Sequence, residues 1–328
     1  MHPFTYTRAA DSDQAAQLAR NATFIAGGTT MSDLMRLDVL QPDGLVDINP
    51  LARRRHGAIE AGPEGLRFGA LVRMTEAERH PTVLNDYPVI AESLKLAASP
   101  QIRNMASLGG NVLQRTRCSY YREPSWPCNK RVPGSGCAAL EGVNRQHAIL
   151  GTSPSCIAAY PGDFAQALVA LDATLEIKGP DGTRHIPFAE LHCLPAETPH
   201  IETTLQPGEL IAFIHVPSGA WTRRSHYLKV RDRDSYAFAL ASAAVALDLE
   251  GTRVREARIA LGGVATVPWR ARAAEQALMG QDINEANAVA AAEAAFASAQ
   301  PHGDNTFKVA LGKQTLVRAL LETSRMRA

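Results

Sequence analysis

The sequence has almost no net charge. Its 34 Lys and Arg residues are balanced by 33 Asp and Glu residues, which gives a formal net charge of +1 over 328 residues. A chain without an excess of positive charge is a poor match for nucleic acid or for an anionic membrane surface. The tight basic run Arg53-Arg54-Arg55 is interpreted as a solvated loop, the usual role of short charge runs. We therefore expect no nucleic-acid partner.

Long apolar runs are also missing. No stretch reaches the ~18 apolar residues of a membrane span, so no membrane insertion is expected. The first residues, Met1–Arg8, lack the basic segment and apolar run of a signal peptide. If the protein works outside the cytoplasm, we expect a partner to carry it there.

Several well-known signatures do not occur. The sequence has neither the Gly-x-Gly-x-x-Gly pattern of Rossmann dinucleotide sites nor a Walker loop, and it contains no His-Glu-x-x-His or Gly-x-Ser-x-Gly motif. These absences leave a Rossmann fold, a P-loop and a serine-hydrolase elbow without support.

Cysteine is scarce and unevenly placed. Four of the five cysteines are clustered, and the fifth lies apart; the clustered ones are Cys118, Cys128, Cys137 and Cys156. Clustering in a chain too poor in cysteine for a disulfide scaffold indicates metal or redox chemistry. The gaps lack the close pair of a zinc ribbon, so an Fe–S cluster, a zinc site and unligated core cysteines all stay open. Cys193, in an apolar setting, is interpreted as a buried free thiol.

The order of predicted elements indicates two domains, as the length also does. Short strands, glycine turns and helices alternate in residues 1–220. The pattern then changes to three strands followed by three helical runs, at 225–231, 241–250, 253–262, 269–279, 285–299 and 306–325. Strands followed by helices indicate an α+β module. The prediction is an α+β chain with domains 1–220 and 221–328.

Two short segments combine paired glycines with hydroxyl or amide donors. In Ile25–Ser32 a β-favouring run leads into two glycines, two threonines and a serine, and Ser107–Asn111 reads Ser-Leu-Gly-Gly-Asn. Glycine lets the backbone approach a bulky anion because no Cβ intervenes. An ordinary βα turn is the alternative for each segment alone. Together the two segments suit a long ligand held at both ends, such as a dinucleotide.

The order of these segments resembles a known family, the FAD-binding medium subunits of molybdenum hydroxylases (the xanthine dehydrogenase family). The matching positions are Ile25–Thr30, Ser107–Asn111, Pro161-Gly162-Asp163, Leu210-Ile211 and Lys229, with Val267–Ala271, Glu275 and Leu278 resembling the family's C-terminal domain. The resemblance covers essentially the whole chain. It implies a two-subdomain FAD-binding domain of the PCMH type, then a C-terminal domain with a three-stranded antiparallel sheet and a three-helix bundle.

The resemblance also implies the residues that bind FAD. One loop would wrap the pyrophosphate, namely Ile25, Ala26, Gly27, Gly28, Thr29, Thr30, Met31 and Ser32. The second loop would line the other side, namely Ala106, Ser107, Gly109, Gly110, Asn111, Leu113 and Gln114. Asp163 would accept a hydrogen bond from the flavin or its ribityl chain, and Leu210 and Ile211 would pack on the cofactor. Lys229 would place its charge near the ring, although the sequence alone favours an exposed cation.

About forty residues separate Gly-Gly-Asn from Pro161-Gly162-Asp163, where the family pattern is almost continuous; Gly162 stands at a usual serine position. This insert, at about 114–158, carries the four clustered cysteines. An insert with a [4Fe–4S] cluster is a feature of periplasmic aldehyde oxidoreductases, and 4-hydroxybenzoyl-CoA reductase has a comparable one. The resemblance thus implies that Cys118, Cys128, Cys137 and Cys156 bind a [4Fe–4S] cluster.

The implied function is electron transfer in a heterotrimeric molybdenum-dependent aldehyde oxidoreductase. Electrons would pass from a large molybdopterin subunit through a small [2Fe–2S] subunit, and through this chain's cluster and FAD, to an external acceptor. No catalytic acid or base is expected in this chain. The expected location is the periplasm, by export with a signal-bearing partner, with the cytoplasm as alternative. A reductase of the opposite electron flow and a non-redox scaffold with structural zinc are the rival interpretations.

Overall fold

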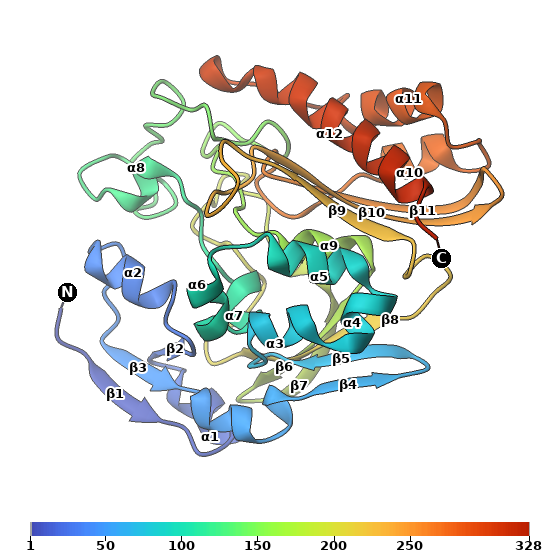
Figure 1. The fold of residues 1–328 in the computed structure, drawn as a ribbon. Coiled ribbons are helices and arrows are strands. Elements are labelled where there is room, and N and C mark those ends of the chain that lie inside the picture. Colours follow the sequence, from blue (N-terminus) through green and yellow to red (C-terminus); the bar gives the residue numbers. More distant parts are fainter. Residues whose placement is uncertain (1, 328) are drawn as a thin grey trace.

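The computed structural model describes residues 2–327, and its strands form three separate sheets (Figure 1). The strands are β1 (Thr5–Arg8), β2 (Thr23–Ile25), β3 (Gly44–Asp47), β4 (Ile59–Gly62), β5 (Gly65–Gly69), β6 (Thr174–Gly179), β7 (Gly182–Pro187), β8 (Leu210–Pro217), β9 (Ser225–Val230), β10 (Ala241–Glu250), β11 (Arg253–Gly262) and β12 (Trp269–Arg270). The helices are α1 (Ser12–Leu18), α2 (Met31–Arg36), α3 (Met74–Arg79), α4 (Pro81–Asp86), α5 (Pro88–Lys95), α6 (Pro100–Met105), α7 (Leu108–Val112), α8 (Ser119–Arg122), α9 (Phe164–Ala170), α10 (Arg272–Leu278), α11 (Glu285–Ala295) and α12 (Phe307–Ser324).

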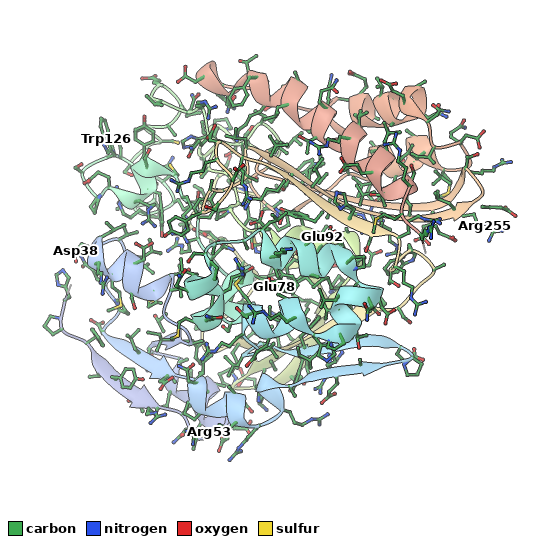
Figure 2. All side chains as sticks on the ribbon, in the orientation of Figure 1. Asp38, Arg53, Glu78, Glu92, Trp126 and Arg255 are labelled. Carbon is green, nitrogen blue, oxygen red and sulfur yellow. The ribbon has the colours of Figure 1, made fainter. Side chains whose placement is uncertain are left out.

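The first sheet is small and parallel, in the order β1-β3-β2. Helix α1 begins after Asp11, whose carboxylate accepts a hydrogen bond from the Gln14 N–H at 2.8 Å and so caps the first turn. The helix buries two alanines against this sheet, in a core that includes Val46 and Leu51. The basic run Arg53–Arg55 is exposed, and Figure 2 labels Arg53 at the edge of the molecule.

The second sheet is antiparallel, in the order β4-β5-β8-β6-β7. Helices α5 and α9 lie between this sheet and the C-terminal sheet in Figure 1. The largest core of the molecule forms here; members that are essentially without exposure include Phe68, Phe164, Phe188 and Leu168. The two sheets of this domain are the two subdomains that the resemblance implies.

The C-terminal domain has a four-stranded antiparallel sheet, in the order β12-β11-β10-β9. The prediction of three strands followed by a helix from residue 269 was therefore incomplete. Trp269 and Arg270 first pair with Leu261 and Ala260 as β12, and α10 starts only at Arg272. Helices α10, α11 and α12 cover one face of the sheet in Figure 1, which agrees with the predicted three-helix bundle.

The region between α7 and α9 contributes almost no regular structure. Its single described helix is the one-turn α8, and turns make up most of the rest. Tyr121 and Cys128 share a small hydrophobic cluster with Leu34 of α2 and Val39. The insert therefore relies on neighbouring elements for its shape. Along residues 2–327, no helix is both long and apolar enough to cross a membrane.

His226 of β9 lies where the two domains meet and contacts two carboxylates. Its Nδ1 is 2.8 Å from Oε2 of Glu92 on α5, and its Nε2 is 3.1 Å from Oε2 of Glu322 on α12. Figure 2 labels Glu92 at the side of α5 that faces the C-terminal sheet. Burial by itself lowers the pKa of His226, but the hydrogen bonds and charges of Glu92 and Glu322 outweigh burial and raise it. Arg318, 2.7 Å from Glu322, is the other charged group of this network.

We expect this contact to make stability fall at alkaline pH. The pKa of His226 in the folded chain lies above its ordinary value of about 6.5. The stabilisation is therefore complete below about pH 6.5 and is lost as the pH rises through the folded-state pKa. Urea unfolding at several pH values should show a decrease of up to about 1 kcal/mol, the scale of partly exposed ion pairs.

The matched variants are His226→Gln and His200→Gln. His226→Gln should remove this part of the pH dependence. His200 is the control because it is exposed and pairs with no carboxylate among residues 2–327. A wild-type pH slope in His226→Gln would contradict the assignment.

Candidate functional site

The two glycine segments lie against each other. A Cβ at Gly27 would collide with the carbonyl oxygen of Met105, so the first loop touches the residues just before the second. Two residues that the sequence analysis did not single out connect the loops. Asn49 donates to the Ala26 carbonyl at 2.9 Å, and Arg73 donates both to Asn49 Oδ1 at 2.9 Å and to the Met105 carbonyl. The sequence thus folds two distant segments into one cradle.

The four glycines of the cradle have different roles. Gly27 and Gly109 are required for packing, since a Cβ at Gly109 would lie 2.9 Å from the Ala70 Cβ. Gly28 and Gly110 face more open space. Gly28 adopts a φ of +71°, and a Cβ there would meet no atom closer than Ser32 Oγ at 3.2 Å; a Cβ at the exposed Gly110 would meet only Ser107 Oγ, at 2.9 Å. Gly28 and Gly110 are therefore the positions where a ligand can approach the backbone.

The cradle contains polar atoms without protein partners. The side-chain oxygen of Asn111 is buried and accepts no hydrogen bond, while its amide nitrogen contacts only the Met74 sulfur, at 3.4 Å. Within residues 2–327, the hydroxyls of Thr29, Thr30 and Ser32 donate no hydrogen bond, and Thr30 does not cap α2 with its side chain. Buried polar groups are normally satisfied, so the buried Asn111 oxygen fits a polar ligand between the loops. The half-exposed hydroxyls of Thr29, Thr30 and Ser32 can also donate to such a ligand. Ser107 is different, because its hydroxyl already accepts the Gly110 N–H at 3.2 Å.

Asp163 and Lys229 form a buried ion pair. Lys229 Nζ is 2.8 Å from Asp163 Oδ2 and also donates to the Leu96 carbonyl at 3.0 Å. The Lys229 side chain is 1% exposed, so the interpretation from sequence alone as an exposed cation was wrong. Tyr227 donates to Asp163 Oδ1 at 2.7 Å and lies 2.9 Å from Ser242 Oγ. Burial raises the pKa of the Asp163 carboxyl, while the Lys229 charge and the two hydrogen bonds act against that rise.

The remaining predicted flavin contacts stay predictions. Leu210 and Ile211 begin β8, and their side chains lie in two hydrophobic cores. Leu113 and Gln114 follow α7 and line a cavity that also contains His192, Cys193 and Glu202. Cys193 is a free thiol with intermediate burial, and burial raises its pKa.

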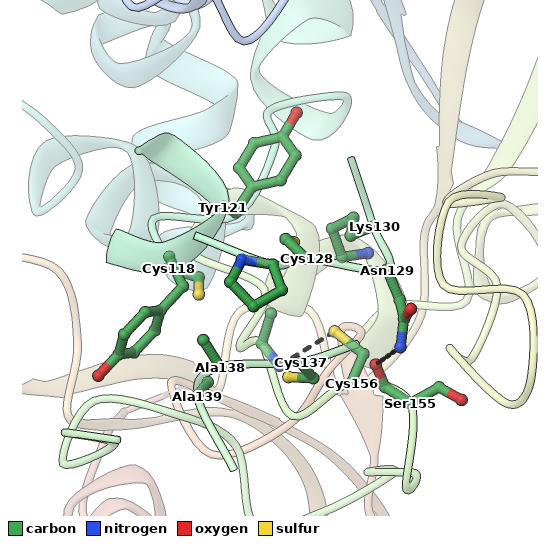
Figure 3. Close-up of a pocket in the computed structure, with 13 residues that line it drawn as sticks. Cys118, Tyr121, Cys128, Asn129, Lys130, Cys137, Ala138, Ala139, Ser155 and Cys156 are labelled. Atoms are coloured by element: carbon green, nitrogen blue, oxygen red, sulfur yellow. Dashed lines mark hydrogen bonds between the residues drawn. The ribbon is translucent and has the colours of Figure 1, made fainter. Parts of the chain in front are cut away.

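The four clustered cysteines line one pocket (Figure 3). Cys118 precedes α8, and Cys128 and Cys137 are opposed in an isolated β-bridge. Cys156 completes the set after a second turn, in which it pairs with Ser153. All four are free thiols. Three loop segments widely spaced in sequence thus bring their sulfur atoms toward one cavity.

Cys128 and Cys156 are buried, Cys118 and Cys137 are partly buried, and hydrogen-bond donors face the sulfurs of Cys118 and Cys156. Burial raises the pKa of the Cys118 thiol to about 12 and that of Cys156 to about 11. The Ala158 N–H donates to Cys156 Sγ at 3.5 Å, and the charge of Lys130 acts against the burial of Cys156. The backbone N–H groups of Tyr120 and Tyr121 face Cys118 in the same way. A metal that binds here must displace the thiol protons, and the surrounding donors favour the resulting thiolates.

No three His, Cys, Asp or Glu side chains in the described chain are arranged to hold a single metal ion. Within the described chain, the structure itself therefore shows neither a zinc site nor a [4Fe–4S] site. Four cysteine thiolates are a donor set that zinc and [4Fe–4S] clusters both use.

The pocket and the cradle are linked through Asp33 of α2. Arg117 Nη1 is 3.1 Å from Asp33 Oδ2, and Arg122 Nη1 is 2.8 Å from the same oxygen. Hydrogen bonding to Arg122, with the charge of Arg117, lowers the pKa of Asp33 despite burial. The helix that follows the first glycine loop is thus joined to the residues on either side of Cys118. None of these three residues has a local sequence signature, because the pairs are 84 and 89 positions apart.

Family models match two successive parts of the chain. Residues 2–219 match the FAD binding domain in molybdopterin dehydrogenase, and residues 226–323 match the CO dehydrogenase flavoprotein C-terminal domain. The first match alone covers more than half of the chain and contains both glycine loops and all five cysteines.

Individual proteins match over nearly the whole length. The aldehyde oxidoreductase FAD-binding subunit PaoB of Escherichia coli (strain K12) is 47% identical over 326 residues, which is 98% of each chain. The carbon monoxide dehydrogenase medium chain of Hydrogenophaga pseudoflava is 28% identical over 93% of this chain and 90% of its own length. A solved structure of carbon monoxide dehydrogenase from that organism superposes with a TM-score of 0.75 and 27% identity, covering 98% of this chain and 96% of the other.

Two glycine variants separate ligand binding from packing. In Gly110→Ala the new methyl group meets only the Ser107 hydroxyl, so we expect a folded protein that has lost most of its bound flavin. In Gly27→Ala the methyl group would collide with the backbone of Met105, so we expect a loss of stability of about 1–3 kcal/mol, typical of overpacking. Flavin absorbance of the purified chains and urea unfolding measure the two effects. Full flavin in a stable Gly110→Ala protein would show that the cradle does not hold the cofactor at this position.

Proposed function

This chain belongs to the FAD-binding medium subunits of the molybdenum hydroxylase family, and we propose that it is the flavin- and [4Fe–4S]-carrying subunit of a heterotrimeric molybdenum-dependent aldehyde oxidoreductase. The observation that carries this proposal is the pocket lined by Cys118, Cys128, Cys137 and Cys156 beside the glycine-loop cradle. The 47% identity to an aldehyde oxidoreductase FAD-binding subunit supports the substrate class.

The cradle accounts for flavin binding. Gly28 and Gly110 leave room for the pyrophosphate, and the free hydroxyls of Thr29, Thr30 and Ser32 can donate to it. Asn111 offers an unused acceptor oxygen to a hydroxyl or N–H of the cofactor. FAD, once bound, supplies the exchange of electrons with an outside acceptor. The chain's own task is to bind and orient the flavin and to exclude other reactions.

The four cysteines account for the cluster, which would supply one-electron relay chemistry. Cys118 is four residues beyond Gln114, a predicted flavin contact. Its neighbour Arg117 is ion-paired to α2, which follows the other flavin loop. These contacts support a short route between cluster and flavin. Lys130 and Arg115 share an ion pair with Glu202, which leaves one net positive charge near the cysteines. That charge favours electron uptake by an anionic cluster.

The proposal implies two partner subunits. A large molybdopterin subunit would oxidise the aldehyde, and a small [2Fe–2S] subunit would relay electrons to this chain. The names of the relatives support this arrangement, since they denote a subunit and a medium chain of larger enzymes. The assembled complex should be yellow-brown, with flavin and broad Fe–S absorption bands. It should reduce an external acceptor with aldehydes and leave aromatic CoA thioesters unreduced; the reverse preference would favour the reductase alternative.

Replacing single cysteines tests the cluster. Cys137→Ser should remove about four irons per chain, the content of one [4Fe–4S] cluster, and should destabilise the subunit because metal binding there contributes to folding. Cys193→Ser is the matched control, because Cys193 lines a neighbouring cavity and not the pocket of the four cysteines. Iron analysis and low-temperature EPR of the reduced complexes measure both. Full iron in Cys137→Ser, or loss of iron in Cys193→Ser, would refute this ligand set.

The proposed location is the periplasm, reached by export of the folded complex with a signal-bearing partner. This location follows from the resemblance of the insert at about 114–158 to that of periplasmic aldehyde oxidoreductases. In cells that lack the small subunit, we expect this chain to stay in the cytoplasm, where its cofactors are inserted. Cell fractionation with immunoblotting checks the expectation, and periplasmic accumulation of this chain alone would overturn it.

A further inference from the structure

A histidine of the insert contacts one of the four cysteines. His147 Nε2 lies 3.2 Å from Cys118 Sγ, within hydrogen-bond distance for sulfur. The His147 residue is 5% exposed, and its ring packs beside Tyr120 with 6.2 Å between centroids. What the ring does to the sulfur depends on whether Nε2, the nitrogen that faces Cys118, carries a proton.

The proton belongs on Nε2. The other ring nitrogen, Nδ1, is buried and makes no hydrogen bond of normal geometry within residues 2–327; the backbone of Asn144 is the polar group beside the ring. An N–H group left unpaired in that position would cost about 1–3 kcal/mol. With the proton on Nε2, the N–H group points at Cys118 Sγ, and Nδ1 is the unprotonated, buried nitrogen. The arrangement makes His147 a donor to Cys118 once that residue is a thiolate.

The C-terminal domain holds His147 in place through its backbone. Asn305, fully buried at the start of α12, donates to the carbonyls of His147 at 3.4 Å and Ala148 at 3.2 Å. Lys308, on the first turn of α12, donates to the carbonyl of Gln146 at 3.0 Å and to that of Gly263 at 2.7 Å. The segment around His147 is therefore fixed by residues more than 150 positions later in the chain.

We propose that His147 is a positioning residue that donates an N–H···S hydrogen bond to the Cys118 thiolate and thereby raises the reduction potential of the cluster. This inference rests on the cluster proposed above. One-electron reduction adds negative charge to the cluster and its thiolates, so a hydrogen bond to sulfur is stronger in the reduced state. His147 therefore favours the reduced cluster. Its effect falls on Cys118, the ligand nearest in sequence to the flavin loop at Gln114.

The test is an EPR-monitored redox titration of the assembled complex. His147→Leu removes the donor at similar volume, and we expect a lower midpoint potential with unchanged iron content. His147→Gln keeps an N–H near the position of Nε2 and should restore most of the potential. Tyr120→Phe is the matched control, because it alters the neighbouring ring without touching the donor. A wild-type potential in His147→Leu with full iron would overturn the inference.

A second measurement does not depend on the stability of His147→Leu. In wild-type complex labelled with 15N-histidine, pulsed EPR of the reduced cluster should show a hyperfine coupling to one histidine nitrogen, absent from His147→Gln. A reduced cluster without that coupling would also overturn the inference, even if His147→Leu loses its iron. A wild-type complex without iron would instead refute the cluster itself and with it the proposed function.

Discussion

The ion pair between Asp163 and Lys229 is the contact on which the arrangement of the two domains depends. Asp163 precedes α9 in the flavin domain and Lys229 lies in β9 of the C-terminal domain, with both side chains almost fully buried. Buried charges are tolerated only when they are paired and hydrogen-bonded, and removing one partner typically costs about 3–5 kcal/mol. Tyr227 and the Leu96 carbonyl complete the required hydrogen bonds. The pair acts together with a hydrophobic core that both domains share, which includes Phe164 of α9 and Ala244 of β10. These contacts orient β9 against α9 on one side of the insert.

The insert has too little apolar surface to define its own shape. It contributes Tyr121 and Cys128 to a small cluster shared with α2, and Ile149 and Leu150 to the core of the C-terminal domain. Several of its other fixed points are polar. Arg131 donates to four backbone carbonyls around α8, at Tyr120, Tyr121, Pro124 and Trp126. On one side, Asp33 holds the insert to the flavin loop, and on the other Asn305 and Lys308 hold it to the last helix. A cysteine pocket built from loops can thus be rigid because its backbone is fixed from two domains.

Features that stand out in the local sequence could be predicted. The two loops were found because each combines paired glycines with hydroxyl or amide donors. The four pocket residues were found because they are clustered in a chain that has few other cysteines. Features that depend on distant partners could not be predicted. Lys229 was interpreted as exposed because its partner is 66 positions away, and Asn49, Arg73 and His147 have no local pattern that distinguishes them. The two-residue β12 was missed because pairing with β11, and not propensity, defines it.

The way the last helix fixes the insert has a consequence for biosynthesis. Protein chains are made from the N-terminus, so all four cysteines leave the ribosome long before Asn305 and Lys308 exist. Until then, Gln146–Ala148 lacks the side-chain donors that fix its backbone, and the loop that carries Cys156 is not yet positioned. The pocket is therefore completed only on the finished chain. Under the proposed function, the cluster would be inserted only after the C-terminal domain has folded.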